Sequence, residues 1–135
     1  MRTPRPPVIV LAAALSLIPS VGRAHHSFAA QYDSSRVVTL RGVVDRFDWT
    51  NPHAILWVEA DAGAPNATTW AIEVGSPNGL TRTGVSRKSL RKGDAVVIEC
   101  FLAKDGSHQA NGFSIRRADG TVVLGSPGEK HPLSR

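Results

Sequence analysis

The sequence predicts an all-β protein: a small OB-fold-like Greek-key barrel of five to six strands, with one short helix between the third and fourth strands. Short runs of alternating, β-branched and aromatic residues recur between turns rich in Gly, Pro, Asn and Asp. A Ser-Pro helix start stands between the third and fourth runs. This order is that of an OB-fold. A lipocalin-like barrel would need eight strands, and an immunoglobulin sandwich would lack the helix.

Residues 1–24 read as a secretory signal. Arginines near the start are followed by an apolar run over residues 8–18, and Gly22 and Ala24 are the small residues that signal peptidase prefers before its cut. The apolar run is shorter than the roughly 20 residues of a membrane span. We therefore expect cleavage after Ala24 and a periplasmic or secreted protein without a membrane span. A cut after Gly22 is the alternative.

The remaining chain has the length of one domain. We expect an OB-like barrel over residues 25–124 that begins with an extended arm, residues 25–36, and a loose tail over residues 125–135. Phe28 and Tyr32 are the apolar residues of the arm and are expected to anchor it on the barrel.

The expected strands share β-branched and aromatic enrichment or period-two alternation, and they cover residues 37–49, 54–60, 68–74, 95–103, 111–117 and 121–124. Gly42 lies within the first strand, where a bulge would let the strand bend between two faces of a closed sheet. Residues 50–52 end that strand in a turn, because Pro52 cannot donate to a ladder. Residues 61–67 form the next hairpin loop.

The expected helix starts at Ser76, an N-cap residue, with Pro77 at its first position. It is short, because Gly84 ends it. The Gly93-Asp94 turn leads into the fourth strand, and the Asp-Gly pair at residues 105–106 predicts the hairpin that follows it.

The alternation also predicts a common core. It comprises Val38, Leu40, Leu56, Val58, Trp70, Ile72, Ile98 and Phe113. Cys100, the one cysteine, alternates with these apolar positions and is expected to be a small core residue, so no intramolecular disulfide forms. Trp49 and Trp57 are assigned to the core in preference to the wall of a site.

The net charge argues against a nucleic-acid partner. The formal charge is +5, but signal cleavage removes three basic residues and no acidic residue. The remaining excess is too small for an electrostatic nucleic-acid surface.

Cleavage after Ala24 would free the α-amine of His25. An amine and an imidazole on one residue chelate a metal ion, in the arrangement called a histidine brace, and His26 follows directly. The one methionine, Met1, leaves with the signal, so a thioether site for copper(I) is excluded. Nitrogen ligands favour copper(II) before zinc.

Further candidate residues lie in loops and on the short helix. His53 follows the first strand and His108 precedes the fifth, and both loops border the usual ligand face of an OB-fold, so we expect them near one mouth of the barrel. His53 is a candidate metal ligand and His108 a candidate additional ligand. Asn78 and Arg82 share a helix face that could bind an anion or a partner. Four acidic residues offer oxygen ligands or an orienting second shell, and spacing selects none of them: Asp33, Asp45, Asp48 and Glu59.

Several motifs together resemble a bacterial family of small exported proteins of unknown function. They are Ala24-His25-His26-Ser27-Phe28, Trp49-Thr50-Asn51-Pro52-His53, Gly75-Ser76-Pro77-Asn78 with Leu80, Arg82 and Gly84, and Gly93-Asp94. The resemblance covers nearly all of the mature chain and implies a periplasmic OB-like barrel without assigning an activity. His108 and His131 lie outside these motifs.

Three functions remain open. The first is a periplasmic protein that binds, delivers or buffers a metal ion, copper(II) before zinc. The second is a metal-free binding module for a small ligand or a partner protein. A copper oxidase or oxygenase ranks last, because it needs an open coordination position and a substrate surface. The chain contains no nucleophile elbow, phosphate loop or HExxH motif, so a binding role is favoured over an enzymatic one.

Overall fold

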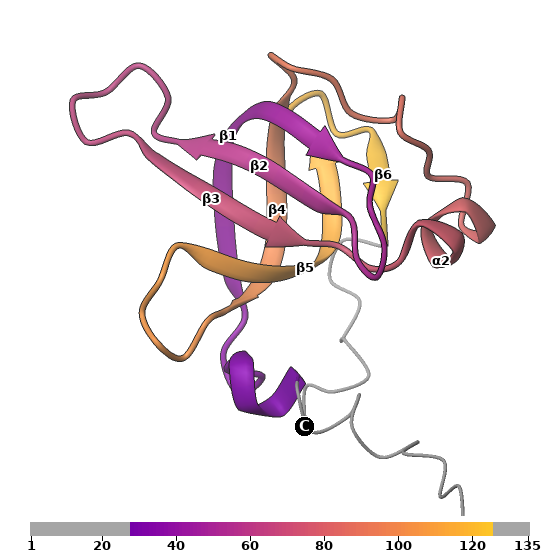
Figure 1. Cartoon of the computed structure of the whole chain (residues 1–135). Coiled ribbons are helices and arrows are strands. Elements are labelled where there is room, and N and C mark those ends of the chain that lie inside the picture. Colours follow the sequence, from indigo (N-terminus) through magenta and orange to yellow (C-terminus); the bar gives the residue numbers. More distant parts are fainter. Residues whose placement is uncertain (1–27, 126–135) are drawn as a thin grey trace, which may run out of the picture.

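The computed structural model describes residues 28–125 and shows a strongly curved six-stranded sheet (Figure 1). Its elements are β1 (Val38–Asp48), β2 (Ile55–Ala60), β3 (Thr68–Glu73), α2 (Pro77–Arg82), β4 (Ala95–Leu102), β5 (Gln109–Arg117) and β6 (Val122–Leu124). These elements follow the order expected from the sequence. No helix of the described residues is long and apolar enough to cross a membrane.

A parallel pairing closes the sheet into a barrel. The strand order is β3-β2-β1-β4-β5-β6, and β3 also pairs with β5, with Ala71 opposite Gln109 and Glu73 opposite Asn111. Five strands thus form a closed ring, and β6 is added at the edge of β5. This is the arrangement of an OB-fold and confirms the predicted fold class.

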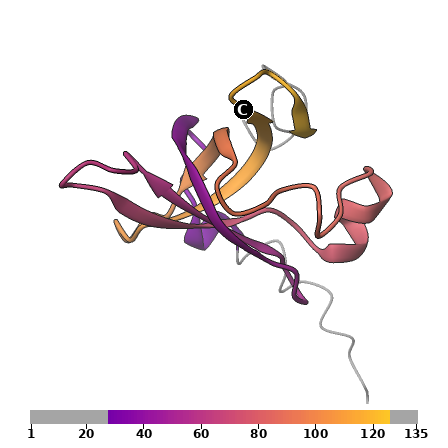
Figure 2. The same ribbon diagram turned by 90° about the horizontal axis from the view of Figure 1, so that it is seen from above.

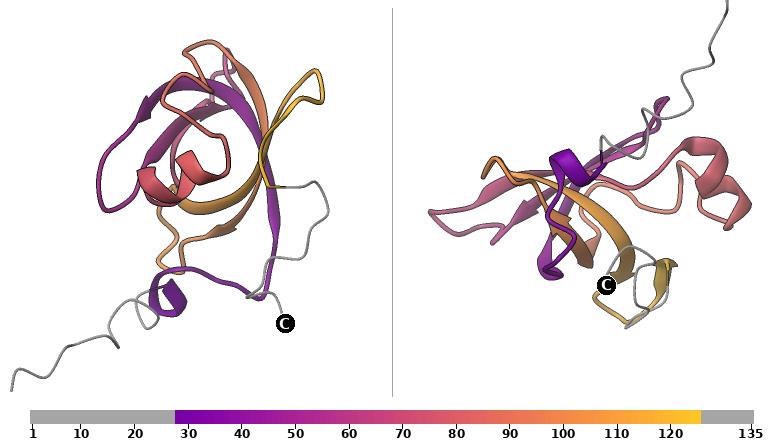
Figure 3. Two further views of the ribbon diagram at one scale, coloured as in Figure 1. Left: turned by 90° about the vertical axis from the view of Figure 1, so that its right-hand side faces the viewer. Right: turned by 90° about the horizontal axis from the view of Figure 1, so that it is seen from below.

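The helix α2 lies across one end of the barrel (Figure 3, left), and the β2–β3 loop lies at the opposite end of the molecule (Figure 2). Ser76 caps the helix as predicted, because its Oγ accepts from the Gly79 backbone N at 3.2 Å. Pro77 and Leu80 are buried beneath it.

The long strand β1 is shared between two neighbours. Gly42 pairs with Ala60 of β2 and with Val96 of β4. A Cβ at this position would meet the Glu59 carbonyl oxygen, and Val58 Cγ1 at 2.6 Å, so the close approach requires glycine. The expected bulge lies elsewhere: the β1–β2 register shifts between Val44 and Arg46.

The barrel interior contains most of the predicted core. Leu56, Val58, Ile72 and Ile98 are buried together, and Leu40 and Trp70 pack against them. Val38 is only partly buried. Phe113 does not join this core, and the prediction for it was wrong.

Cys100 is fully buried in the main core, as expected. Burial raises the pKa of its thiol to about 12. Trp49 packs against the same core, whereas the indole N–H of the half-buried Trp57 donates to Asp48 Oδ2 at 2.8 Å.

A second apolar cluster covers the outer face of β4 and β5. Phe101 is fully buried there against Tyr32, and Phe28 and Phe113 pack around them. Residues 28–31 are helical and not extended as predicted. The Tyr32 backbone N donates to the Phe28 carbonyl at 2.9 Å, which places the two rings on one side, with centroids 5.4 Å apart. Both residues anchor the arm, as expected.

Ile72→Ala tests the core assignment. The Ile72 side chain has no solvent exposure, so its truncation should lower the free energy of unfolding by about 2–5 kcal/mol. Val37→Ala is the matched control, because Val37 is 48% exposed and its truncation should change stability by less than about 0.5 kcal/mol. Urea denaturation measures both. Equal losses would contradict the assignment of the inner face of β3.

Candidate functional site

The turn that carries His53 is fixed against the end of β3. The Ala54 backbone N donates to the Gly75 carbonyl at 2.8 Å, and the Val74 N donates to the Ala54 carbonyl at 3.1 Å. Gly75 has a φ of +108°, which glycine adopts without strain. These bonds hold His53 beside the last residue of β3.

That residue is Glu73, and its carboxylate joins two side chains from distant parts of the sequence. Glu73 Oε1 lies 3.0 Å from His53 Nδ1, and Oε2 accepts from the Tyr32 hydroxyl at 3.1 Å. A carboxylate only accepts, so Nδ1 carries the proton of the neutral ring and the lone pair lies on Nε2. The His53 side chain is 48% exposed.

Strand geometry explains why these groups meet. Glu73 and the core residue Ile72 are neighbours in β3 and point to opposite faces, so Glu73 lies on the outer face of the barrel. There the register places Glu73, Asn111 and Phe101 side by side across β3, β5 and β4. Tyr32 packs on Phe101 and reaches along this row to Glu73.

Tyr32 stays a hydrogen-bond donor at ordinary pH. Burial raises the pKa of its hydroxyl well above 10.0, and the Glu73 charge and hydrogen bond raise it further. The carboxylate therefore has the Tyr32 hydroxyl as donor on one oxygen and the His53 ring nitrogen beside the other, as a partly buried charge requires.

His108 does not share this site. Its carbonyl accepts from the Ala71 backbone N at 3.0 Å, and its ring lies against Trp70, with centroids 5.0 Å apart. Trp70 packs against the barrel core, on the face of β3 opposite Glu73. The expectation that His53 and His108 meet at one mouth is therefore not met.

His25 and His26, and also His131, lie outside the described residues. Between residues 28 and 125, no group of three or more His, Cys, Asp or Glu side chains is arranged to hold a metal ion. Of the predicted metal ligands, His53 and His108 lie within the described residues, and of these two only His53 has a carboxylate beside its ring.

The four predicted acidic candidates do not orient His53. Asp45 pairs with Lys92 at 2.7 Å, Asp48 accepts from Trp57, Asp33 accepts from Ser35, and Glu59 is exposed. Asn78 and Arg82 are exposed on α2, where neither is buried against the barrel.

The sequence interpretation missed Glu73. A signal was present in the predicted hairpin: if residue 60 pairs with residue 68, then Ile55 lies opposite Glu73, next to the turn that carries His53. The structure has this register.

Fold and site together define a small OB-fold-like barrel with a carboxylate-oriented histidine at its surface. The chain belongs to a family of unknown function (DUF6152), whose sequence profile matches residues 14–113. No protein of curated function matches it significantly.

Two solved structures are similar to this chain. The mitochondrial single-stranded DNA-binding protein Rim1 from S. cerevisiae has a TM-score of 0.49 and 12% identity, covering 64% of this chain and 95% of its own. TiaS, in a complex with tRNA and ATP, has a TM-score of 0.44 and 23% identity, covering 61% of this chain and 18% of its own.

The titration of Tyr32 tests this hydrogen-bonded arrangement. Tyr32 is the single tyrosine, so phenolate absorbance reports it alone. In the folded protein this absorbance should appear only well above pH 10.0. Glu73→Gln should lower the midpoint part of the way toward 10.0, because burial remains when the charge is removed. Glu59→Gln, on the exposed face of β2, should leave it unchanged.

The raised pKa of Tyr32 also determines how the stability of the protein changes with pH. The unfolded chain loses the phenol proton near pH 10.0 and the folded chain only at higher pH, so stability should fall as pH rises above 10.0. Tyr32→Phe should lose this component of the alkaline destabilisation. A normal titration midpoint in the folded wild-type protein would show that Tyr32 is not held by Glu73.

Proposed function

We propose that this chain is an exported metal-binding protein that takes up one copper(II) ion, in preference to zinc, through the amine and ring of His25 together with the ring of His53. One observation supports the proposal: Glu73 Oε1 lies 3.0 Å from His53 Nδ1, where the carboxylate can hold the Nδ1 proton and leave Nε2 as the ligating nitrogen. Metal-binding histidines usually donate their second ring N–H to a carboxylate in this way, which fixes the ring and raises its basicity.

The anchoring of the N-terminal segment supports the participation of His25. Phe28 packs edge-on against Phe101, with ring centroids 6.0 Å apart, and the neighbouring Tyr32 ring ends at Glu73. Three residues precede Phe28 back to His25. An extended residue spans about 3.3–3.6 Å, so this tether reaches roughly 10 Å from Phe28. His26 lies on the same tether and is a candidate further ligand.

The ligand chemistry selects the metal. Imidazole and amine nitrogens bind copper(II) more strongly than zinc in the Irving–Williams order. Cys100 does not compete as a ligand, because it is fully buried and its pKa of about 12 keeps it a neutral thiol. The proposed site is therefore built from nitrogen ligands alone, with Glu73 and Tyr32 behind them.

Export and processing are the first test. The secreted form should begin at His25, because Gly22 and Ala24 precede that cut. Intact-mass measurement of the protein from the periplasm or the medium identifies the first residue. A mature chain that keeps Arg23 would have an amide where the proposed chelate needs an amine, and would contradict the terminal clamp.

Copper uptake is the second test. Calorimetry on the mature protein should give one copper(II) site, and one added residue before His25 should weaken binding sharply, because it converts the chelating amine into an amide. His53→Ala should also weaken binding. Since ligands must be deprotonated to coordinate, affinity should fall as the pH is lowered.

Glu73→Gln separates this site from adventitious binding by any histidine. Loss of the orienting carboxylate should weaken copper binding by about 10–100-fold while both ligands remain. The matched controls are Glu59→Gln and His131→Ala, which should bind copper as the wild type does. If the chain with the added residue binds copper as tightly as the native chain, the His25 amine is not a ligand. If Glu73→Gln binds copper as tightly as the wild type, Glu73 does not orient His53 as a ligand.

A further inference from the structure

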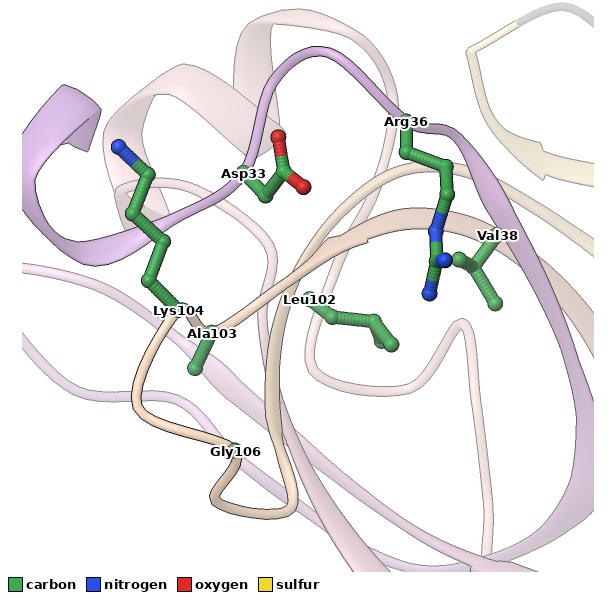
Figure 4. A pocket seen from close by; sticks show the side chains of 7 residues that line it. All are labelled: Asp33, Arg36, Val38, Leu102, Ala103, Lys104 and Gly106. Atoms are coloured by element: carbon green, nitrogen blue, oxygen red, sulfur yellow. The ribbon is translucent and has the colours of Figure 1, made fainter.

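A pocket separate from the His53 site lies on the other side of the Tyr32–Asp33 segment. It has a volume of about 330 Å³ and is formed between the segment leading into β1 and the turn after β4. Val38 and Leu102 provide its apolar surface, and Asp33, Arg36 and Lys104 provide its charged groups (Figure 4). This volume is within the range of sites for small molecules.

Backbone hydrogen bonds fix the two walls relative to each other. The Asp33 N donates to the Leu102 carbonyl at 3.0 Å, and the Lys104 N donates to the Gln31 carbonyl at 2.9 Å. Tyr32 and Ala103 form a β-bridge between them. The pocket is therefore preformed and needs no closure to bind a ligand.

The charged groups are arranged at different sides of the apolar surface. Both charged residues belong to the segment leading into β1: the guanidinium of Arg36 lies beside Val38, whereas Asp33 stands at the other end of this segment (Figure 4). Lys104 is directed away and donates to the Ala29 carbonyl at 2.6 Å.

Two of these groups keep free hydrogen-bonding capacity. Asp33 Oδ1 accepts from the Ser35 N and hydroxyl, and among residues 28–125 no group donates to Oδ2. These bonds, with the charges of Lys104 and Arg36, lower the pKa of Asp33, so it is ionised at neutral pH. Within the described part of the chain, Arg36 forms no ion pair shorter than 4.0 Å.

We propose that this pocket binds a small zwitterion, an α-amino acid with an aliphatic side chain. Arg36 presents a planar fork of donors that matches a carboxylate, and Asp33 accepts from an ammonium group. The aliphatic side chain would cover Val38 and Leu102. A simple anion would leave Asp33 unpaired beside it, which is why opposite charges on one ligand fit better than one charge.

Calorimetry with three matched ligands tests the proposal on metal-free protein, because amino acids also chelate copper. L-leucine has both charges, leucinamide lacks the carboxylate, and 4-methylpentanoate lacks the amine. Leucine should bind most tightly, and loss of either charge should weaken binding about tenfold, the equivalent of ~1.4 kcal/mol. Equal binding of leucine and 4-methylpentanoate would reduce the site to an anion pocket and overturn the zwitterion proposal.

Substitutions locate the site. Arg36→Gln should weaken leucine binding about tenfold, and Asp33→Asn should abolish the advantage of leucine over 4-methylpentanoate. Arg41→Gln is the control, because Arg41 is exposed as Arg36 is but lies on β1 and does not line the pocket.

Methyl chemical shifts provide a readout that does not depend on the variants. Addition of leucine to wild-type protein should shift the Val38 and Leu102 signals and leave the core residue Ile72 unchanged. Unshifted Val38 and Leu102 signals at saturating leucine would overturn the proposal. The copper proposal and the amino-acid proposal can be disproved independently, because the amine of His25 does not take part in this pocket.

Discussion

The parallel pairing of β3 with β5 is the constraint on which the rest of the structure depends. It closes the barrel, and in doing so sets Ile72 opposite Ala110 inside and Glu73 opposite Asn111 outside. The inside pair is fully buried. The outside pair extends to Phe101 of β4, which gives the N-terminal segment an apolar surface beside a carboxylate. The β3–β5 register thus determines which residues lie on the inner and on the outer face of the sheet.

Glu73 then links elements that no covalent connection brings together. A partly buried carboxylate must be paired or hydrogen-bonded, and its two partners come from the start of the described chain and from the β1–β2 turn. The same bonds have opposite consequences for their partners. The pKa of Tyr32 is raised, so its hydroxyl stays protonated, whereas His53 has its Nδ1 beside the carboxylate and its side chain half exposed. The strand pairing therefore fixes the position of Glu73, and Glu73 contacts the ring of His53.

Local patterns predicted the strands well, because alternation and turn residues are read within a few positions of each other. The helix start at Ser76 and the hairpins fell where their turn chemistry placed them. Phe113 was assigned to the wrong side, because β5 faces inward at Gly112 and Phe113 contacts Phe101 outside. An aromatic residue on the outer face is buried only because a segment distant in sequence packs on it. The alternation of residues within a strand does not predict such a contact.

The anchoring of Phe28 and Tyr32 bears directly on how a terminal ligand could be held. Ordering a flexible backbone costs about 1–2 kcal/mol per residue, so a chain end tethered through the whole arm would lose much of its binding energy. Here Phe28 and Tyr32 pack on Phe101. In the proposed site three residues separate this packing from the amine of His25, and a short tether keeps the effective concentration of the amine near His53 high. The aromatic cluster therefore contributes to the proposed metal affinity without touching the metal.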